Sequence, residues 1–231
     1  KKILSELGLS PRKGLGQNFL IDQGPVNTII EAADIKSVDV IIEIGPGLGI
    51  VTQQILQTAR KVIAVELDQK LAIALEQKMQ NPSFTVIYGD AREVDVDAIS
   101  LNMRYKLVAN LPYYAASPIL RHFLESPNHP TKVVAMLQRE VAQNIVAEPG
   151  NMSLMSVGIQ LYGKPTIVAY VPPSAFYPRP KVTSAIIHID VYNEPLLKLD
   201  NRDAFFRIVR AGFSAPRKQL HNSLSHGLKI S

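Results

Sequence analysis

The chain has 231 residues, of which 46% are hydrophobic, and this is enough for one large domain with a substantial core and a small appendage. It contains no cysteine, which excludes disulfides, thiolate catalysis and cysteine metal sites. Its apolar runs are far shorter than the roughly 18 residues of a membrane helix, so we expect a soluble, cytoplasmic protein without a membrane partner. The net charge of +5 is compatible with a polyanionic partner, although many unrelated proteins are equally basic.

The first two thirds of the chain alternate short β-branched runs with segments of helical periodicity. A helix is predicted over residues 24–33, with Asp22 as its candidate cap. Strands are predicted over residues 38–44, 61–65, 84–88, 106–109 and 132–137, and helices over residues 50–58, 69–79 and 118–125. Such alternation is typical of βαβ units, and the predicted fold class is therefore α/β with a parallel sheet.

The last third of the chain is predicted to contain more strands and then helices. A helix over residues 139–146 precedes strands over 154–162, 166–171 and 182–191, with a turn at Gly163-Lys164-Pro165. Such an ending resembles a sheet closed by an antiparallel pair. After the polar segment 193–203, helices are predicted over residues 204–211 and 219–228.

We place a domain boundary in the polar segment. Residues 1–192 then form the large domain, and residues 193–231 form a small helical domain. Because Lys1 is not an initiator methionine and the chain stops just after a helical pattern, we expect a fragment of a longer protein with a truncated C-terminal domain.

A glycine-rich turn follows the strand that ends near residue 44. Its glycines, Gly45, Gly47 and Gly49, are spaced G-x-G-x-G and preceded by the acidic Glu43. A dinucleotide site has the spacing G-x-G-x-x-G, whereas the compressed form with an acid before it favours S-adenosylmethionine, which has no pyrophosphate to bind. The glycines would then let the backbone approach the ligand closely.

Two further carboxylates follow the next two predicted strands. Glu66 is placed to accept hydrogen bonds from both hydroxyls of a ribose, and Asp90 could accept from an adenine amino group. Because the ends of parallel strands line one crevice, we expect Glu43, Glu66 and Asp90 to lie together in a cofactor site. A nicotinamide cofactor could use Glu66 in the same way, and each acid taken singly could be an ordinary loop residue.

The run Asn110-Leu111-Pro112-Tyr113 ends the fourth strand of the predicted parallel sheet. The exocyclic amine of a nucleobase is conjugated with its ring and is barely nucleophilic. A catalyst must therefore present oxygen acceptors to the hydrogens of the amine while an aromatic face holds the base. Asn-Leu-Pro-Tyr offers both, and it indicates an enzyme that methylates such an amine.

These blocks, together with three others, resemble those of the small-subunit ribosomal RNA adenine dimethyltransferases, the kasugamycin-sensitivity enzyme family. The resemblance covers nearly the whole chain. It implies two methyl transfers to N6 of each of two adjacent adenosines near the 3′ end of small-subunit rRNA, a Rossmann-like S-adenosylmethionine-dependent methyltransferase sheet, and a small helical C-terminal domain. The further blocks are Gly14-Leu15-Gly16-Gln17-Asn18-Phe19-Leu20, Phe176-Tyr177-Pro178-Arg179-Pro180-Lys181-Val182-Thr183-Ser184-Ala185 and Arg217-Lys218-Gln219-Leu220-His221-Asn222-Ser223-Leu224.

The resemblance implies a role for each cofactor-binding residue. Asn18 and the backbone of Leu20 would close over the methionine and adenosine parts of the cofactor. Gly45, within the turn that also holds Glu43 and Gly47, would approach the cofactor directly. Glu66 and Asp90 would bind its ribose and adenine, and Asn110 would lie between cofactor and substrate.

It also implies catalytic roles for the residues around Asn110. The Asn110 side-chain oxygen and the Leu111 carbonyl would accept the two N6 hydrogens, and Pro112 would hold that carbonyl toward the pocket. Tyr113 and Phe176 would stack on the two faces of an adenine that has left its helix. Without the resemblance, Phe176 could belong to an ordinary loop.

Six basic residues in or beside these motifs are candidates for phosphate contacts around the pocket mouth. Alternatively, these basic residues lie on solvent-exposed helix faces and bind no ligand. We expect the selectivity to come from the shape of a small ribosomal subunit or of its assembly intermediate, since the grooves of RNA helices are poorly read by side chains. The candidates are Arg12, Lys13, Arg179, Lys181, Arg217 and Lys218.

No metal is expected, because the five histidines lack the spacing of metal ligands, and we expect a monomer. Three features depart from the family pattern. Leu15 replaces a residue that is often aromatic, the connection at residues 150–153 is short, and the C-terminal domain is truncated.

The nearest alternative is the sister group that methylates an adenine of large-subunit rRNA and confers macrolide resistance. It shares the Gln-Asn-Phe-Leu and Asn-x-Pro-Tyr chemistry, but Gly16, Leu111 and the block that starts at Phe176 favour the small-subunit group. An assembly or transcription factor that has kept only the fold is a second alternative, which the presence of Glu66, Asn110, Tyr113 and Phe176 disfavours. A dehydrogenase is disfavoured by the glycine spacing.

Overall fold

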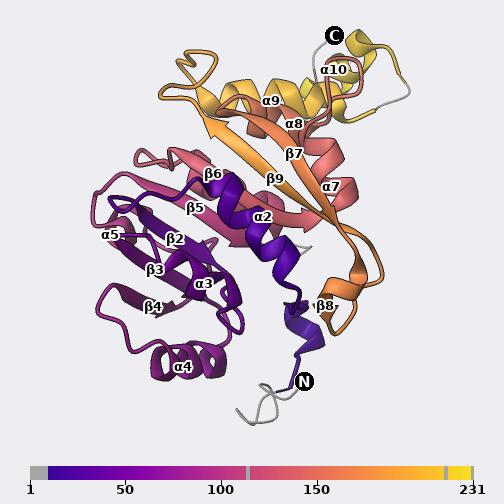
Figure 1. The fold of residues 1–231 in the computed structure, drawn as a ribbon. Helices are drawn as coiled ribbons and strands as arrows, with labels where there is room; N and C mark the ends of the chain where they lie inside the picture. The colour runs from indigo at the N-terminus through magenta and orange to yellow at the C-terminus, as the bar shows by residue number, and fades with distance from the viewer. Residues whose placement is uncertain (1–9, 113–114, 216–217, 230–231) are drawn as a thin grey trace.

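The computed structural model describes residues 10–112, 115–215 and 218–229. Its centre is a seven-stranded sheet in the order β4, β3, β2, β5, β6, β9, β7 (Figure 1). The first five of these strands in the sheet order are parallel to one another, β9 is antiparallel to β6, and β7 is antiparallel to β9. The strands are β2 (Val40–Ile44), β3 (Lys61–Glu66), β4 (Phe84–Tyr88), β5 (Tyr105–Asn110), β6 (Lys132–Gln138), β7 (Gly163–Val171) and β9 (Ser184–Val191).

This topology creates a switch point between β2 and β5. The chain proceeds from β2 to β3 and β4 on one side and then returns to β5 on the other side of β2. At such a point the loops after the two strands diverge and leave a crevice at the carboxyl ends of the strands. The predicted parallel sheet with an antiparallel ending is confirmed.

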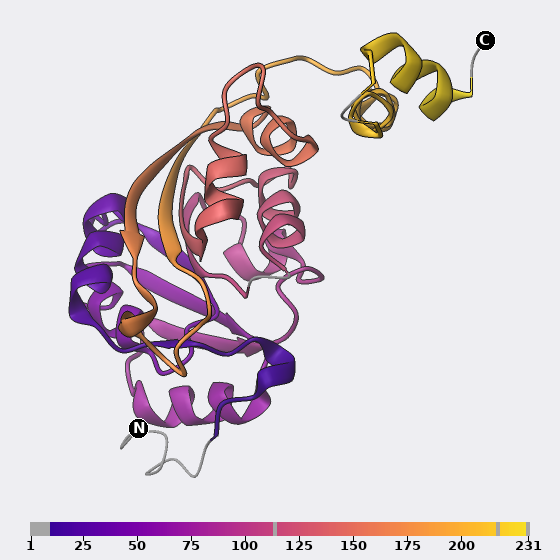
Figure 2. The ribbon, with the colours of Figure 1, turned by 90° about the vertical axis from the view of Figure 1, so that its right-hand side faces the viewer.

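Helices cover both faces of the sheet (Figure 2). On one face α2 (Gln23–Ala33) and α3 (Ile50–Ile55) pack on Ile41 of β2, and on the other α6 (Ala116–Leu124), α7 (Arg139–Ile145) and α8 (Leu154–Gln160) share a core with Ile42. Neighbouring strand residues therefore point to opposite cores, as expected for a strand buried on both faces. The helix α4 (Gln69–Lys78) packs along β3 and β4, and the short α5 (Val96–Ser100) precedes β5.

The strand predicted over residues 154–162 is wrong, because this segment is helix α8. Short apolar runs do not distinguish a buried strand from a buried helix by periodicity. The decisive feature is a capping box, in which the Ser153 hydroxyl accepts from the Ser156 N–H while the Ser156 hydroxyl accepts from the Ser153 N–H.

The turn predicted at Gly163-Lys164-Pro165 is also wrong. These residues begin strand β7, where Gly163 pairs with Val191 and Pro165 with Ile189. Pro165 lacks an N–H to donate to a neighbouring strand, but β7 lies at the edge of the sheet, where this is tolerated.

A two-stranded sheet that was not predicted joins the N-terminal segment to the loop after β7. Strand β1 (Phe19–Leu20) pairs antiparallel with β8 (Phe176–Tyr177), so that Leu20 lies opposite Phe176. Short 3-10 turns precede each strand, η1 (Lys13–Leu15) before β1 and η2 (Pro173–Ala175) before β8. Two segments far apart in the sequence are thereby held side by side.

The last two helices, α9 (Arg202–Phe213) and α10 (Leu220–Leu228), pack against each other and stand at the end of the molecule opposite α4 (Figure 1). They remain attached to the sheet domain. Phe206 is buried in the same core as α6 and α8, and the Arg202 guanidinium lies 3.5 Å from the Glu125 carboxylate. The domain boundary at residue 193 stays a prediction. Among the described residues, no helix is long and apolar enough to cross a membrane.

Candidate active site

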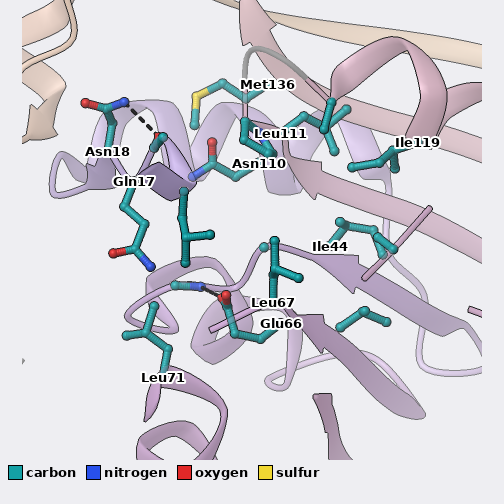
Figure 3. Close-up of a pocket in the computed structure, with 18 of the residues that line it drawn as sticks. Gln17, Asn18, Ile44, Glu66, Leu67, Leu71, Asn110, Leu111, Ile119 and Met136 are labelled. Atoms are coloured by element: carbon teal, nitrogen blue, oxygen red, sulfur yellow. Dashed lines mark hydrogen bonds between the residues drawn. The ribbon is translucent and has the colours of Figure 1, made fainter. Parts of the chain in front are cut away.

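A cleft lies at the carboxyl ends of the parallel strands, where the switch point places it (Figure 3). Ile44, Glu66, Asp90 and Asn110 line it from the ends of β2, β3, β4 and β5 or from the loop that follows. Residues 15–19 of the N-terminal segment form a further wall. The cleft therefore gathers motifs that lie far apart in the sequence.

The glycine turn after β2 forms the floor of the cleft. Gly45 has φ +68°, and its N–H donates to the Val65 carbonyl at 3.0 Å. Gly47 has φ +56°, and its N–H donates to Glu66 Oε2 at 3.2 Å. Both backbone conformations strain any residue with a side chain, so glycine is needed for this turn to follow the neighbouring strand so closely.

Glu66 is buried at the end of β3 and is held by two backbone donors. Its Oε1 accepts from the Asp68 N–H at 2.9 Å and its Oε2 accepts from Gly47. Burial raises the pKa of Glu66, and these two hydrogen bonds oppose the rise. An ionised carboxylate has about four acceptor positions, so Glu66 can still accept hydrogen bonds from a ligand with two neighbouring hydroxyls.

Glu43 does not line this cleft. It lies behind the glycine turn beside a second cavity of about 380 Å³, which Leu20 also lines. Burial, together with the negative charge of Glu66, raises the pKa of Glu43 to about 7. The nearby Thr52 hydroxyl opposes this rise, but neither its oxygen nor Glu43 Oε2 has a partner in hydrogen-bonding geometry among the described residues.

Asp90 lines the cleft and is paired with Arg92. The Arg92 Nε donates to Asp90 Oδ1 at 3.0 Å, and the Arg92 N–H donates to the same oxygen at 2.9 Å. The guanidinium holds the pKa of Asp90 below its usual value. The carboxylate is therefore fixed as an acceptor at the edge of the cleft.

Asn110 and Leu111 lie on the side of the cleft opposite Glu66 (Figure 3). The Leu111 N–H donates to the Met136 carbonyl at 3.0 Å, and the Pro112 carbonyl accepts from the Ala115 N–H at 3.0 Å. These bonds fix the backbone on both sides of the Leu111 carbonyl. Tyr113, the last residue of the predicted catalytic block, lies outside the described residues.

Phe176 lines the cleft from β8, and its side chain is only 3% exposed. It packs in the core with Val171, Ala175 and Ile186. The pairing of β1 with β8 therefore brings a rigidly held aromatic ring to the same cleft as Asn110.

The N-terminal wall contains Asn18, whose Nδ2 donates to the Gly16 carbonyl at 3.1 Å. The preceding residue, Gln17, donates from Nε2 to Asp68 Oδ2 at 3.0 Å. Sequence reasoning missed Asp68, Arg92 and Met136. Asp68 was detectable, because an aspartate immediately before a helical pattern is a typical N-cap.

The structure separates the predicted basic residues into two groups. Arg12 precedes the N-terminal wall, and Arg179 and Lys181 are exposed in the loop after β8, beside the cleft. Lys218 is exposed next to α10, which stands at the end of the molecule away from β8 (Figure 1), and it does not line the cleft. The Lys13 side chain and Arg217 lie outside the described residues.

Metal ligands were not predicted, and the described residues contain no group of three or more His, Asp or Glu that could hold a metal ion. His188 has Nε2 3.1 Å from Asp190 Oδ1, and a ring nitrogen of His122 lies 2.8 Å from the Val94 carbonyl. Both histidines have contacts within the fold and lie outside the lining of the cleft.

The mixed seven-stranded sheet, with a glycine turn and a buried carboxylate at its switch point, defines a Rossmann-like S-adenosylmethionine-dependent methyltransferase fold. The family model described as ribosomal RNA adenine dimethylase matches residues 8–229. The chain therefore belongs to the ribosomal RNA adenine dimethylase family, and the predicted membership is confirmed.

Relatives and solved structures agree with this assignment. The chain is 47% identical to a ribosomal RNA small subunit methyltransferase A of Dehalococcoides mccartyi, over 100% of this chain and 80% of the relative. It is 40% identical to the protein of the same name from Moorella thermoacetica, over 96% of this chain and 81% of the relative.

Among solved structures, it is similar to a dimethyladenosine transferase from Plasmodium falciparum, with a TM-score of 0.79 and 30% identity over 90% of this chain and 74% of the other. The 23S rRNA methyltransferase ErmE gives a TM-score of 0.76 and 27% identity over 90% of this chain and 84% of the other. The fold is thus shared with an enzyme named for 23S rRNA, whereas the more similar sequences are named for the small subunit.

Proposed function

We propose that this protein transfers methyl groups from S-adenosylmethionine to N6 of two adjacent adenosines near the 3′ end of small-subunit rRNA, giving N6,N6-dimethyladenosine. We propose that it acts as a cytoplasmic monomer on an assembled or partly assembled small subunit. The observation that carries the proposal is the position of Asn110 and Leu111, which line the same cleft as the glycine turn and Glu66. The names of the full-length relatives support the choice of substrate.

The groups that line the cleft suit the chemistry of S-adenosylmethionine. Gly45 lets the turn lie directly against the end of β5, since a Cβ at this position would stand 2.7 Å from the Asn110 carbonyl oxygen. Glu66 offers acceptor positions for the two ribose hydroxyls, and Asp90 offers one for the adenine amino group. Asn18 would close over the ligand from the N-terminal side, with the Leu20 backbone behind it. Apolar side chains for a planar base include Leu67, Leu71, Ala91 and Ile119.

Glu43 would act from behind the turn. Its carboxylate lies outside the lining of the cleft, but its buried Oε2 lacks a partner among the described residues. We infer that Glu43 contributes to the cofactor site indirectly, from its position next to the glycine turn that lines the cleft.

The cofactor supplies an electrophilic methyl group on a sulfonium, and the protein has to make the adenine amine nucleophilic and aim it. Asn110 Oδ1 and the Leu111 carbonyl would accept the two N6 hydrogens and draw the nitrogen out of conjugation. Pro112 and the hydrogen bond from the Leu111 N–H to Met136 hold the backbone for this task. No strong general base is required, because the nitrogen loses its proton readily once it carries the new bond.

Aromatic stacking would hold the target base. Phe176 would contact one face of the flipped adenine and Tyr113 the other, replacing base stacking with contacts worth about 1–3 kcal/mol per base. After the first transfer the amine has one hydrogen fewer and one methyl more. For the second transfer, the methyl group already on N6 must rotate away from the cofactor. Dimethylation therefore requires free space around N6 for this methyl group.

Phosphate contacts would supply affinity and register for the RNA. Arg12, Arg179 and Lys181 lie on the side of the cleft formed by the N-terminal segment and the loop after β8. Lys218 belongs to the helical end of the molecule, so its contact would be made with a distant part of the RNA (Figure 1). We keep Lys13 and Arg217 as candidates on the basis of the sequence alone.

Substrate choice can be tested with methyl-labelled S-adenosylmethionine and three acceptors: small subunits that lack these methyl groups, unmodified large subunits and naked small-subunit rRNA. The proposal requires label in the small-subunit particles. Label in large-subunit RNA would instead assign the protein to the macrolide-resistance group. Binding of RNA without transfer to any acceptor would indicate an assembly or transcription factor.

A further inference from the structure

A polar network ties the N-terminal wall of the cleft to the loop after β3. Gln17 Nε2 donates to Asp68 Oδ2 at 3.0 Å, and Gln17 Oε1 accepts from the Arg12 N–H at 2.8 Å. The Arg12 guanidinium lies 3.4 Å from the same Asp68 oxygen. Asp68 is buried, with 5% of its side chain exposed, whereas 49% of the Arg12 side chain is exposed. We call Arg12, Gln17 and Asp68 the latch.

The two ends of the latch belong to different parts of the cofactor cleft. Residues 15–19 line the cleft from the N-terminal side, and Glu66 lines it from β3. Asp68 also donates its N–H to Glu66 Oε1 at 2.9 Å. A single residue therefore holds the carboxylate that would bind the ribose and the segment that would close over the cofactor.

The chemistry of the groups fixes the direction of each hydrogen bond. An ionised Asp68 has no hydrogen to donate, so Gln17 must present its amide N–H to it. The Arg12 backbone has an N–H and needs the Gln17 oxygen. Asp68 and the Arg12 N–H therefore determine the orientation of the Gln17 amide. With Asp68 in place, a residue at position 17 preserves the latch only if it donates to Asp68 and accepts from Arg12.

Asp68 has a second role, which has to be separated from the first. Its Oδ1 accepts from the Lys70 N–H at 3.0 Å and caps helix α4, whereas its Oδ2 takes part in the latch. Asparagine caps helices as well as aspartate does. Asp68→Asn can therefore keep the cap through its oxygen while it turns an N–H₂ group toward Gln17.

We propose that Asp68 is a positioning residue for methyl transfer, which holds residues 12–18 closed over the cofactor through its bond to Gln17 and at the same time orients Glu66. This inference rests on the proposed function, since the cleft that the latch closes is the proposed S-adenosylmethionine site. Loss of the latch should weaken cofactor binding and raise the KM for S-adenosylmethionine, while kcat at saturating cofactor stays near that of the wild type.

A reversal of polarity tests the latch. Gln17→Glu places two carboxylates against each other, and Asp68→Asn places two N–H₂ groups against each other. In the double variant the new carboxylate at position 17 accepts both from the new amide at position 68 and from the Arg12 N–H, so the bond between positions 17 and 68 is restored with the same net charge. The ion pair of the half-exposed Arg12 guanidinium with position 68 stays lost, as in Asp68→Asn alone, and an exposed ion pair of this kind contributes little. Matched controls are Gln23→Glu, where the exposed Gln23 donates to Asn27, and Asp22→Asn, where the exposed Asp22 caps α2 by accepting from the Gly24 N–H.

Two readouts are measured on each variant: the affinity for S-adenosylhomocysteine by calorimetry, and amide hydrogen exchange of residues 12–18 without ligand. Each single change should weaken binding about tenfold, the effect of leaving a partly buried polar group unpaired. Exchange of the segment should become faster in the single variants. The double variant should bind within about threefold of the wild type, and the controls should bind like the wild type.

The latch is refuted if both single variants bind and exchange like the wild type, or if the losses of the two single variants multiply in the double variant. If Asp68→Asn lowers the melting temperature markedly, Gln17→Ala removes the same bond at its half-buried partner, Gln17. Gln17→Ala must then weaken S-adenosylhomocysteine binding about tenfold. A wild-type protein that does not bind S-adenosylhomocysteine refutes the proposed function, and hydrogen exchange in the ligand-free variants still decides whether the latch exists.

Discussion

The backbone carbonyl oxygen of Asn110 lies 2.7 Å from the point where a Cβ atom on Gly45 would stand. Strands β2 and β5 are neighbours in the sheet, with Ile44 opposite Ala109, so the turn after β2 and the block that ends β5 meet directly. The proposed cofactor and substrate groups are thus held in contact by the backbone itself. A reaction between two bound molecules depends on this kind of fixed distance.

Gly45→Ala should reduce cofactor binding and stability together. The new methyl group would collide with the Asn110 carbonyl, and the φ of +68° at this position is strained for alanine. We expect a loss of about 1–3 kcal/mol in the free energy of unfolding and a large rise in the Kd for S-adenosylhomocysteine. Thermal unfolding and calorimetry measure both quantities. Gly24→Ala, in helix α2 where the nearest atom is 3.4 Å away, is the control. It should leave the Kd unchanged and should not lower the free energy of unfolding, because alanine suits a helix better than glycine.

Asn110→Ala should slow methyl transfer strongly while the cofactor still binds. The change removes one of the two proposed acceptors of the N6 hydrogens, and removal of one such electrostatic contact typically lowers kcat by about 10²–10³-fold. Transfer of a labelled methyl group under saturating cofactor measures this effect. Asn27→Ala, on the exposed face of α2, is the control. Unchanged kcat in the Asn110 variant would remove this residue from the proposed mechanism.

Glu43→Gln should make stability less dependent on pH. The pKa of Glu43 is about 7 in the folded protein and 4.5 in an unperturbed glutamate, so the folded state keeps a proton that the unfolded state releases between these values. The stabilising contribution of this group is therefore complete below about pH 4.5 and is lost as the pH rises to about 7. The full loss is about 3 kcal/mol in order of magnitude.

Denaturant unfolding at several pH values measures the difference between the variant and the wild type. The variant should gain stability relative to the wild type as the pH rises from 4.5 to 7, and the difference should then level off. A difference that stays constant over this range would mean that Glu43 is ionised in the folded protein.

Lys181→Gln should weaken RNA binding with little dependence on sequence. Lys181 is exposed beside the cleft, and loss of one phosphate contact reduces the slope of log affinity against log salt by about 1. Titration of small-subunit rRNA at several salt concentrations gives this slope. The control is Lys164→Gln, because Lys164 is exposed near the start of β7, away from the end of that strand that pairs with Ser184. Equal slopes for both variants would exclude a contact specific to Lys181.

The parallel part of the fold was predictable from the sequence because its strands are rich in β-branched residues and end in recognisable turns. Four of these strands are also largely buried, whereas β4, at the edge, is partly exposed. Prediction failed at α8, where an apolar run suits either a strand or a helix and a serine capping box decides. It also failed at Gly163 and Pro165, because proline is acceptable in an edge strand and the position of a strand in the sheet cannot be read locally.

The residues that line the candidate site were predictable where a polar side chain directly follows a strand of the parallel sheet. Glu66 and Asn110 follow strands directly, and the topology brings them to one cleft. The latch was not predictable, since the bond between Gln17 and Asp68 spans 51 residues and depends on how the N-terminal segment returns to the sheet. The position of Glu43 behind the turn was likewise hidden, because periodicity does not say which side of a glycine turn an acid occupies.

The most direct test of the proposed function is nucleoside analysis of small-subunit rRNA after incubation of unmethylated small subunits with this protein and S-adenosylmethionine. We expect N6,N6-dimethyladenosine at two adjacent positions near the 3′ end with the wild type, and far less with Asn110→Ala. Small-subunit rRNA that remains unmethylated by a wild-type protein shown to bind the cofactor would contradict the proposed function.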